Sequence, residues 1–543
     1  MESFSAVNRQ QYLEQMSHAD LDVLIIGGGI TGAGILLDAV SRGLRAGLVD
    51  MQDFAAGTSS RSTKLIHGGL RYLKQLEFRL VAEVGKERAI VARNAPHITK
   101  PEPMILPIYK QGSLGYTSAS IALAVYDFLA GVKKSERRKM LSKEEVLKLE
   151  PGLKSQGLKG GAYYYEYRTD DARLTIEILK KATELGAIAC NYAKVEDILK
   201  TERVVSGVRV REVTNNSYYN IPARYVVNAT GPWVDAIDKL DDALSEEKLV
   251  HTKGVHIVLD RARLPIKHSL YFDTPDGRMV FAIPRQGKVY AGTTDTFYSG
   301  NLENPMANKV DRDYILNSLN QIFPDAKLTF EDVESWWAGL RPLIKQKGKS
   351  ASGISRKDEL FETSSGLITI AGGKLTGYRK MAQRVVDLIV KKIRAVKTTG
   401  PCITDQIRLS GAVGEDVNYD EFYKNKLEEF QSIGLSEAAS SQLLDRYGSN
   451  VDKIISIWKE GDQSEASLDK AQWIYCIENE MTLYPDDFLT RRTGETYFNI
   501  EKALKYRDTI TNFYSKYFHW DDELEQNVVA QTHNKINQVT SIK

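Results

Sequence analysis

A glycine-rich turn near the N-terminus has the residue types and spacing of a phosphate-binding loop. Gly27, Gly29 and Gly32 form a G-x-G-x-x-G motif directly after the apolar run LDVLII. Such glycines allow a tight turn, a close approach of pyrophosphate to the backbone, and close packing of helix on strand. Asp50 ends the next apolar run, where a carboxylate can accept hydrogen bonds from ribose hydroxyls. The motif predicts a dinucleotide site; the alternative is a glycine turn that binds no ligand.

This motif does not distinguish FAD from NAD, but two later features favour FAD. No second G-x-G-x-x-G occurs, so the sequence shows no separate NAD domain. Residues 228–233 (NATGPW) and 371–374 (AGGK) each follow a strand-like run. Small residues at strand ends let the backbone approach a flat ring system, although either segment alone could be an ordinary turn.

A dense group of hydrogen-bond donors follows Asp50, in residues 57–73 (GTSSRSTKLIHGGLRYL). Hydroxyls and glycine amides can contact a pyrophosphate or a flavin edge, and a guanidinium can hold a phosphate by two parallel hydrogen bonds. From composition alone, a polar loop with solvated charges is an equally good interpretation. The side chains concerned are Thr58, Ser59, Ser60, Ser62, Thr63, Lys64, His67, Arg71 and Tyr72.

Three further basic side chains stand beside glycine turns. Arg341 lies in AGLRP, Lys374 lies in GGKLT, and His256 lies in the strand-like run KGVHIV. A helix starting after Gly373 would attract anions at its N-terminus. Each residue alone is more often a surface charge or a satisfied core histidine, but next to a flavin site their combination favours a role in that site.

Composition and residue counts exclude several classes of protein. Among 543 residues, 73 Lys and Arg balance 71 Asp and Glu, so there is no electrostatic reason to expect nucleic acid. The three cysteines fit no disulfide framework, which favours a reduced cytosolic compartment. The eight histidines form no ligand cluster, so we expect no metal, and no G-x-S-x-G nucleophile elbow occurs.

The sequence also lacks signals for secretion or membrane spanning. The N-terminal residues contain no apolar core of a signal peptide, and no apolar run reaches roughly 18 residues. Residues 114–132 come closest, and they precede a basic cluster at 133–139. A packed helix with a solvated basic end is the simpler interpretation, and an interfacial helix on an anionic membrane is the alternative.

The elements that must position these residues predict an α/β fold. A strand at 21–26, a helix ending at Gly43 and a strand at 44–50 begin a doubly wound parallel sheet. We expect a Rossmann-like FAD-binding domain, a strand-rich substrate domain and a C-terminal helical domain. Their predicted limits are 1–100, 170–250 and 340–397 for the FAD-binding domain, 101–169 and 251–339 for the substrate domain, and 398–543 for the helical cap domain.

Local patterns predict further elements. Residues 74–100 have a helical pattern, which the three prolines of 101–109 interrupt. A second helix is expected at 174–187, after Asp170-Asp171 as N-cap. Residues 365–371 form an apolar strand, and a helix follows over 372–390.

Together these motifs closely resemble the bacterial FAD-dependent (aerobic, respiratory) glycerol-3-phosphate dehydrogenase family. The resemblance covers essentially the whole chain, and KLIHGGLRYL together with GGKLTGYRKMA is far more specific than the glycine motif. Other matching stretches are LDVLIIGGGITGAGILLDAVSRG, PMILPIY, DDARLT, NATGPWVD, FAIPRQGKVYAGTTDTFYSG, GLRPL and ENEMTLYPDDFLTRRT. Asp50 stands where the family more often has Glu, a difference that leaves the carboxylate in place.

The resemblance implies a role for each matching residue. Arg71 would bind the substrate phosphate with Tyr72 beside it, Arg341 and Lys374 would line the same pocket, and His256 would be the active-site histidine and first candidate for the base. As catalytic residues it implies His256, Arg341 and Lys374. As FAD contacts it implies Gly27, Gly29, Ile30, Thr31, Gly32, Asp50, Thr58, Ser59, Ser60, Lys64, Leu65, His67, Gly68, Val195, Ala229, Gly231, Gly373, Leu375 and Thr376.

The resemblance further implies oxidation of glycerol-3-phosphate to dihydroxyacetone phosphate, with electrons passed through FAD to membrane quinone. A cytoplasmic enzyme would then contact lipid peripherally at the inner face of the membrane, and a homodimer is one candidate state. No mid-chain insertion typical of the related oxidases occurs, which favours quinone over oxygen as acceptor. Three alternatives stay open: a glycerol-3-phosphate oxidase that uses oxygen, an amino-acid or amine oxidase of the same flavoprotein superfamily, and a nucleotide-binding protein without turnover.

Overall fold

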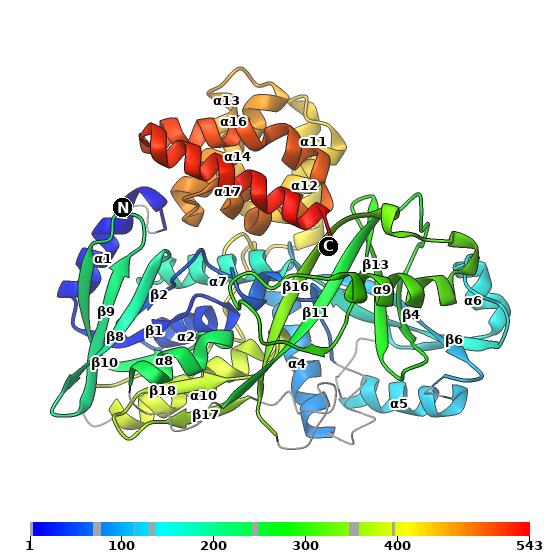
Figure 1. Ribbon diagram of the computed structural model, residues 1–543, viewed down its shortest axis with the longest axis horizontal. Coiled ribbons are helices and arrows are strands. Elements are labelled where there is room, and N and C mark those ends of the chain that lie inside the picture. The colour runs from blue at the N-terminus through cyan, green and yellow to red at the C-terminus, as the bar shows by residue number, and fades with distance from the viewer. Residues whose placement is uncertain are drawn as a thin grey trace.

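The computed structural model describes residues 4–68, 78–112, 115–129, 136–241, 248–346, 358–393 and 397–542. Two β-sheets with their helices form a body, and the C-terminal helices form a separate layer above it (Figure 1). The N-terminal helix α1 (Arg9–His18) packs against the first sheet. The predicted α/β class with a helical C-terminal part is confirmed.

The first sheet carries the glycine-rich turn. Its central strand β1 (Leu21–Ile26) pairs in parallel with β2 (Ala46–Val49) on one side and β10 (Tyr218–Asn228) on the other. All six residues of β1 are buried, as expected for a parallel strand covered on both faces. The sheet also contains β7 (Ile188–Cys190), β8 (Ala193–Thr201), β9 (Val204–Glu212), β17 (Glu359–Glu362) and β18 (Ile368–Ala371).

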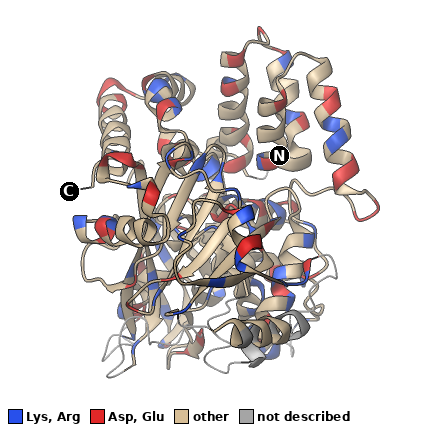
Figure 2. Ribbon diagram, turned by 90° about the vertical axis from the view of Figure 1, so that its right-hand side faces the viewer, with Lys and Arg blue, Asp and Glu red and all other residues tan. Residues whose placement is uncertain are grey.

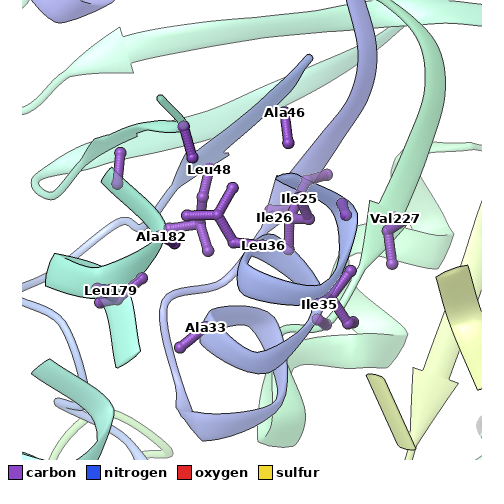
Figure 3. Close-up of a cluster of buried hydrophobic side chains, with 14 of the residues drawn as sticks. Ile25, Ile26, Ala33, Ile35, Leu36, Ala46, Leu48, Leu179, Ala182 and Val227 are labelled. Atoms are coloured by element: carbon purple, nitrogen blue, oxygen red, sulfur yellow. The ribbon is translucent and has the colours of Figure 1, made fainter. Parts of the chain in front are cut away.

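Helix α2 (Ile30–Ser41) packs between α7 (Asp171–Glu184) and α10 (Tyr378–Ile393) against this sheet. Figure 3 shows the apolar core that results, in which Leu36 lies among strand and helix side chains such as Leu48 and Leu179. This burial holds the N-terminus of α2 in a fixed position next to the glycine turn. The helix is therefore positioned by its core contacts as well as by the turn itself.

Two predicted helices begin at different residues from those expected. Asp170 is the N-cap of α7, with its side chain accepting from the Arg173 N–H at 3.1 Å, so the helix begins at Asp171 and not at 174. The helix predicted from residue 372 begins only at Tyr378. Gly372 and Gly373 have φ values of 78° and 89°, so both lie in the left-handed region and form a loop instead.

The second sheet is mixed and is built around two long antiparallel strands. Strand β11 (Leu249–Asp260) pairs with β16 (Val333–Ile344), which places His256 opposite Trp337 and Thr252 opposite Arg341. The remaining strands are β3 (Leu65–Ile66), β4 (Lys100–Tyr109), β5 (Lys139–Leu141), β6 (Leu158–Arg168), β12 (Ser269–Asp273), β13 (Met279–Arg285), β14 (Lys288–Gly292) and β15 (Thr296–Phe297).

Strand β4 shows how a proline-rich segment joins a sheet. Its prolines, Pro101, Pro103 and Pro107, all occupy alternate positions, so their missing N–H groups lie on one edge of the strand. Strand β6 pairs along nearly all of β4, whereas β12 pairs only with Met104 and Ile105. The preceding helix α4 (Phe78–Asn94) already ends next to Pro96, so the prediction that the prolines of 101–109 interrupt it is wrong. Those prolines instead lie in a strand that can still pair.

The described part of the body contains four more α-helices, and that of the C-terminal layer contains seven. Those of the body are α5 (Tyr116–Leu129), α6 (Lys143–Leu149), α8 (Val234–Leu240) and α9 (Lys309–Ile322). Those of the layer are α11 (Tyr419–Ser432), α12 (Glu437–Tyr447), α13 (Val451–Lys459), α14 (Glu465–Glu480), α15 (Glu495–Phe498), α16 (Ile500–Phe518) and α17 (Asp522–Thr540).

The C-terminal layer has its own apolar core, which includes Leu444, Trp458 and Tyr514. Figure 2 shows that charges of both signs are distributed over its helices. No helix in the described ranges is long and apolar enough to cross a membrane. Separate apolar cores under the two sheets and within this layer support the three domains that we propose.

Candidate active site

A cavity of about 660 Å³ opens at the carboxyl ends of parallel strands in the first sheet. Its walls come from the segments that follow β1, β2, β10 and β18, together with the start of β8. Ligands of open parallel sheets bind at this edge, and cavities of roughly 300–1,000 Å³ are typical of small-molecule and cofactor sites.

The glycine turn at this edge has no room for side chains. Gly27 has φ +107°, and a Cβ on Gly32 would lie 1.8 Å from the carbonyl oxygen of Gly27. Gly29 is the N-cap of α2, and Gly29, Ile30 and Thr31 line the cavity. The bare backbone and the helix N-terminus together fit a pyrophosphate group.

Asp50 lines the same cavity, beside the end of β2. Its carboxylate accepts hydrogen bonds from the N–H groups of Gly28 at 2.6 Å and Gln52 at 2.9 Å. Burial raises the pKa of Asp50 to about 7, although these two N–H groups act in the opposite direction. Asp50 is thus placed to accept hydrogen bonds from ribose hydroxyls, and its charge changes close to neutral pH.

The raised pKa of Asp50 makes FAD affinity depend on pH. The ionised carboxylate is the better acceptor for ribose hydroxyls, so binding favours deprotonation. We expect the Kd for FAD to rise as pH falls below about 7. Because only one group, the Asp50 carboxyl, takes up a proton, the Kd should rise by at most ~10-fold per pH unit. Titration of apoprotein with FAD between pH 5.5 and 8.5, followed by flavin fluorescence, measures this.

Two variants separate Asp50 from other titrating groups in that experiment. Asp50→Asn should bind FAD more weakly but with a flat pH dependence in this range, because the side chain no longer titrates. Asp50→Glu should retain the dependence. A wild-type Kd that stays constant across the range would contradict the assignment.

The loop after Asp50 connects the glycine turn to the second sheet. Ser59 Oγ accepts from the Ile30 N–H at 2.9 Å, and Thr58 Oγ1 donates to the Leu340 carbonyl at 2.7 Å. Thr58 and Ser59 both line the cavity, whereas Ser60 is buried beneath it. Lys64 turns away from the cavity, with Nζ 2.6 Å from Asp171 and 3.1 Å from the Ser60 carbonyl.

The two most specific sequence motifs meet in the structure. The Thr376 hydroxyl is 3.2 Å from both the N–H and the carbonyl of His67, so KLIHGG and GGKLTG are joined by hydrogen bonds. Gly68 N–H donates to Glu166 at 3.3 Å, and Leu65 is buried in β3. Lys374 and Leu375, next to this junction, line the cavity. Arg71 and Tyr72 lie outside the described residues.

Arg341 is held in one position by polar groups of the loop after β14. Its guanidinium donates to Thr293 Oγ1 at 3.0 Å and to the Thr294 carbonyl at 3.3 Å, and it pairs with Asp295 at 3.3 Å. A Cβ on Gly254 would lie 2.4 Å from Nη2, so a side chain at this position would displace the guanidinium from its hydrogen bonds. The neighbouring Pro342 lines the cavity.

His256 lies in a buried environment near Arg341. Its ring stacks on Trp337 with centroids 4.8 Å apart, and Nε2 is 3.0 Å from Thr63 Oγ1. Nδ1 is buried and has no hydrogen-bond partner among the described residues. Burial lowers the pKa of His256 well below its usual 6.5, and the charges of Arg341 and Lys64 lower it further. The imidazole is therefore neutral at neutral pH, the form that a base requires.

The structure brings part of the predicted set to the cavity wall. Of the predicted residues, the described wall contains Gly27, Gly29, Ile30, Thr31, Asp50, Thr58, Ser59, Val195, Ala229, Gly231, Gly373, Lys374 and Leu375. It does not contain Gly32, Ser60, Lys64, Leu65, His67, Gly68, His256, Arg341 or Thr376.

Several wall residues were not predicted. They include Met51, Gln52, Ala193, Lys194, Glu196, Trp233, Ala236, Leu240 and Glu303. The Ala193 N–H donates to the Asp50 carbonyl at 2.7 Å, which brings the start of β8 beside Asp50. Trp233 ends the segment NATGPW at 228–233, and its place there was the signal that could have identified it.

Comparison with known proteins decides the family. Residues 22–379 match the family described as FAD dependent oxidoreductase, and residues 402–525 match the C-terminal domain of alpha-glycerophosphate oxidase. The aerobic glycerol-3-phosphate dehydrogenase of Bacillus subtilis is 52% identical over 534 residues, covering 96% of this chain and 95% of that protein. The chain belongs to this dehydrogenase family.

Other members of the family agree in sequence and in structure. A Staphylococcus aureus aerobic glycerol-3-phosphate dehydrogenase is 51% identical over 516 residues, covering 94% of this chain and 93% of that protein. The Bacillus halodurans glycerol-3-phosphate dehydrogenase complexed with FAD matches with a TM-score of 0.86 and 41% identity over 99% of both chains. The predicted family, FAD cofactor and oxidoreductase class are confirmed.

Proposed function

We propose that the protein oxidises glycerol-3-phosphate to dihydroxyacetone phosphate and passes the electrons through FAD to membrane quinone. The observation that carries this proposal is the junction of the KLIHGG and GGKLTG motifs beside a dinucleotide cavity, with Lys374 in its wall. Near-complete coverage by relatives named aerobic glycerol-3-phosphate dehydrogenase supports it.

The chain's own residues would bind and orient a small phosphorylated alcohol. When bound, FAD supplies the hydride acceptor. Lys374 and Arg341 would attract the dianionic substrate, and we retain Arg71 and Tyr72 as predicted phosphate contacts. Fixed orientation of substrate against an acceptor can lower a barrier by several kcal/mol.

We propose His256 as the base that removes the hydroxyl proton. Its buried Nδ1 has no partner among the described residues and can accept that proton. In the free enzyme the lowered pKa of His256 makes this side chain a weak base, but an anionic substrate nearby would raise the pKa of His256. Arg341, whose charge is permanent, would stabilise the developing alkoxide.

Quinone is soluble in lipid, so the proposed acceptor requires peripheral contact with the inner face of the cell membrane. Helix α5 lies in residues 114–132, for which an interfacial helix is the alternative to a packed one, and it exposes Ile121 and Tyr116, which supports this contact. Part of the basic cluster at 133–139 lies outside the described residues. We propose a cytoplasmic location and keep a homodimer as one candidate state.

Anaerobic addition of glycerol-3-phosphate to the purified yellow protein tests the proposed reaction. We expect the flavin absorption bands to bleach near neutral pH, because the substrate reduces the cofactor. Glycerol, which lacks the phosphate, is the matched control and should leave the spectrum unchanged.

Other outcomes of this experiment would favour the alternatives. Bleaching by amino acids alone would indicate an amine or amino-acid oxidase, and a flavin that no substrate reduces would indicate a binding protein without turnover. Reoxidation of the bleached enzyme by a soluble quinone, faster than by oxygen, is expected for a dehydrogenase. The reverse order would indicate an oxidase.

A further inference from the structure

A short loop, residues 61–63 (the RST loop), covers the face of the second sheet that carries His256. His256 on β11 lies opposite Trp337 on β16. Cross-strand partners and residues two apart along a strand share one face, so Gly339, two residues after Trp337, lies on the same face as His256. A Cβ on Gly339 would lie 2.3 Å from the carbonyl oxygen of Arg61. The backbone of the RST loop therefore crosses directly over this face.

Hydrogen bonds to the backbone hold the RST loop against the sheet. The Trp337 indole N–H donates to the Ser62 carbonyl at 3.1 Å, and the Tyr290 hydroxyl donates to the Thr63 carbonyl at 3.1 Å. Trp337 and Tyr290 are both buried, so water does not compete with these hydrogen bonds. On the other side, the Ser62 N–H donates to Asp171 at 2.9 Å. The position from which the Thr63 side chain starts is thus fixed.

Among the described residues, the Thr63 hydroxyl is the one hydrogen-bond partner of the His256 ring. Nε2 lies 3.0 Å from Thr63 Oγ1, whereas Nδ1 is buried and has no polar partner in that part of the chain. The ring stacks on Trp337 with an angle of 12° between the two planes. At its edge, a Cβ on Gly292 would lie 2.5 Å from Cδ2, so the imidazole fills its space. Packing and this hydrogen bond together fix the ring.

We propose that Thr63 positions His256 for proton transfer by accepting a hydrogen bond from Nε2–H, which leaves the lone pair of Nδ1 for the substrate hydroxyl. This inference rests on the proposed role of His256 as base. A neutral imidazole carries one N–H, so the partner of one nitrogen determines the state of the other. The opposite arrangement would bury an Nδ1–H without an acceptor, and buried N–H groups without partners are rare.

Thr63 would act through His256, and its contribution would grow during the reaction. The substrate O–H bond breaks and its proton forms a bond to Nδ1, while the C2 hydride passes to FAD, the acceptor that the proposed reaction already requires. The imidazole then carries a positive charge. Its Nε2–H···Oγ1 hydrogen bond becomes charge-assisted and roughly twice as strong as a neutral one. Thr63 therefore stabilises the state after proton transfer more than the state before it.

Three other groups that can carry charge face His256. Arg341, on β16, and Lys64, next to the RST loop, lower the pKa of His256 through their positive charges. The Tyr290 ring, on β14, lies 6.4 Å from the imidazole, and burial raises the pKa of its hydroxyl, which therefore stays neutral. In this positive environment, the Thr63 oxygen is a polar atom that favours the protonated imidazole.

Rapid kinetics of the holoenzyme test this role. Flavin reduction by saturating glycerol-3-phosphate is followed without oxygen, across the pH range in which histidine titrates, for wild type and Thr63→Val. We expect reduction to be about 10- to 100-fold slower in Thr63→Val, the effect of losing one hydrogen bond to a charged group. The pH below which the rate falls should also decrease, because the protonated imidazole loses its acceptor. KM should stay close to that of wild type, since Thr63 is absent from the described cavity wall.

Two further variants separate positioning from packing. Thr63→Ser keeps the hydroxyl and should restore both the rate and the pH profile. Thr511→Val removes a buried hydroxyl of α16 and should behave like wild type. An unchanged rate and pH profile in Thr63→Val, or no recovery in Thr63→Ser, would refute the positioning role alone. Wild-type enzyme that glycerol-3-phosphate does not reduce would refute the proposed function and, with it, this role.

Nitrogen-15 NMR of the histidine rings in wild-type holoenzyme tests the proposal without turnover and without a Thr63 variant. The signals of His256 are those that disappear in His256→Asn. We expect a proton on Nε2 and none on Nδ1 at neutral pH. A proton on Nδ1 would overturn the proposal even in an enzyme that oxidises glycerol-3-phosphate normally.

Discussion

Replacing Arg341 with alanine is expected to lower kcat/KM for glycerol-3-phosphate by about 100- to 1,000-fold, the range found when one donor to a developing oxyanion is removed. Three polar groups of the loop after β14 hold the guanidinium, so in the proposed role it would meet the substrate without rearrangement. Its charge cannot be lost by deprotonation, unlike that of a histidine. Stopped-flow reduction of the flavin under anaerobic conditions measures the chemical step directly.

The pattern of the kinetic change distinguishes catalysis from folding. FAD affinity of Arg341→Ala should stay near that of wild type, because Arg341 is absent from the described wall of the cofactor cavity. Arg341→Lys should recover part of the rate, since it keeps the charge but not the planar fork. The exposed Arg263→Ala serves as a control and should retain wild-type kcat/KM. Near-normal flavin reduction in Arg341→Ala would exclude the proposed role.

Features that depend on neighbouring residues could be predicted from the sequence. The glycine turn, the buried strand before it and Asp50 follow local rules, and the structure places Gly27, Gly29 and Asp50 on one cavity wall. The N-cap at Asp170 is local too, and it was predicted correctly. The prolines of β4 were interpreted only as helix breakers. Whether a strand can contain them depends on which of its edges has a partner strand, and the sequence does not show this.

Features that depend on distant residues could not be predicted in this way. An imidazole alone has a pKa near 6.5, but Trp337, Arg341 and Lys64 together determine the lowered value of His256. The resemblance implies a cofactor contact at Lys64, but the ion pair of Lys64 with Asp171 across the fold could not be predicted from neighbouring residues. The resemblance to a family supplied the names of such residues, but their environments required the structure.

Replacing Asp53 with asparagine is expected to weaken the attachment of the C-terminal layer, by about 3–5 kcal/mol, the cost of removing one partner of a buried ion pair. Asp53 lies in the loop after β2 and contacts Arg491 at 2.5 Å and Arg492 at 2.8 Å. The side chains of Asp53 and Arg492 are both 0% exposed. Asparagine would leave two buried guanidinium groups without this counter-charge.

The pH dependence of this contribution follows from the pKa of Asp53. Burial raises it, but Arg492 and Arg491 outweigh burial and hold it below the usual 3.8. A carboxyl whose pKa is lowered on folding contributes stability that is complete above 3.8 and lost as pH falls through the lower folded value. Wild type and Asp53→Asn should therefore differ at neutral pH and converge in strong acid.

Hydrogen exchange of the C-terminal helices measures this loss, because opening of the layer exposes their amides. Asp53→Asn should accelerate exchange in the segment around Arg491 and Arg492, and FAD release should follow, since Asp53 shares its loop with Asp50. Asp20→Asn breaks an exposed pair with Arg45 and should leave exchange unchanged.

The double variant Asp53→Leu/Arg492→Met should recover part of the stability, because apolar replacement of both partners leaves one fewer buried charge unpaired. Wild-type exchange rates in Asp53→Asn would show that the ion pair does not hold the C-terminal layer in place.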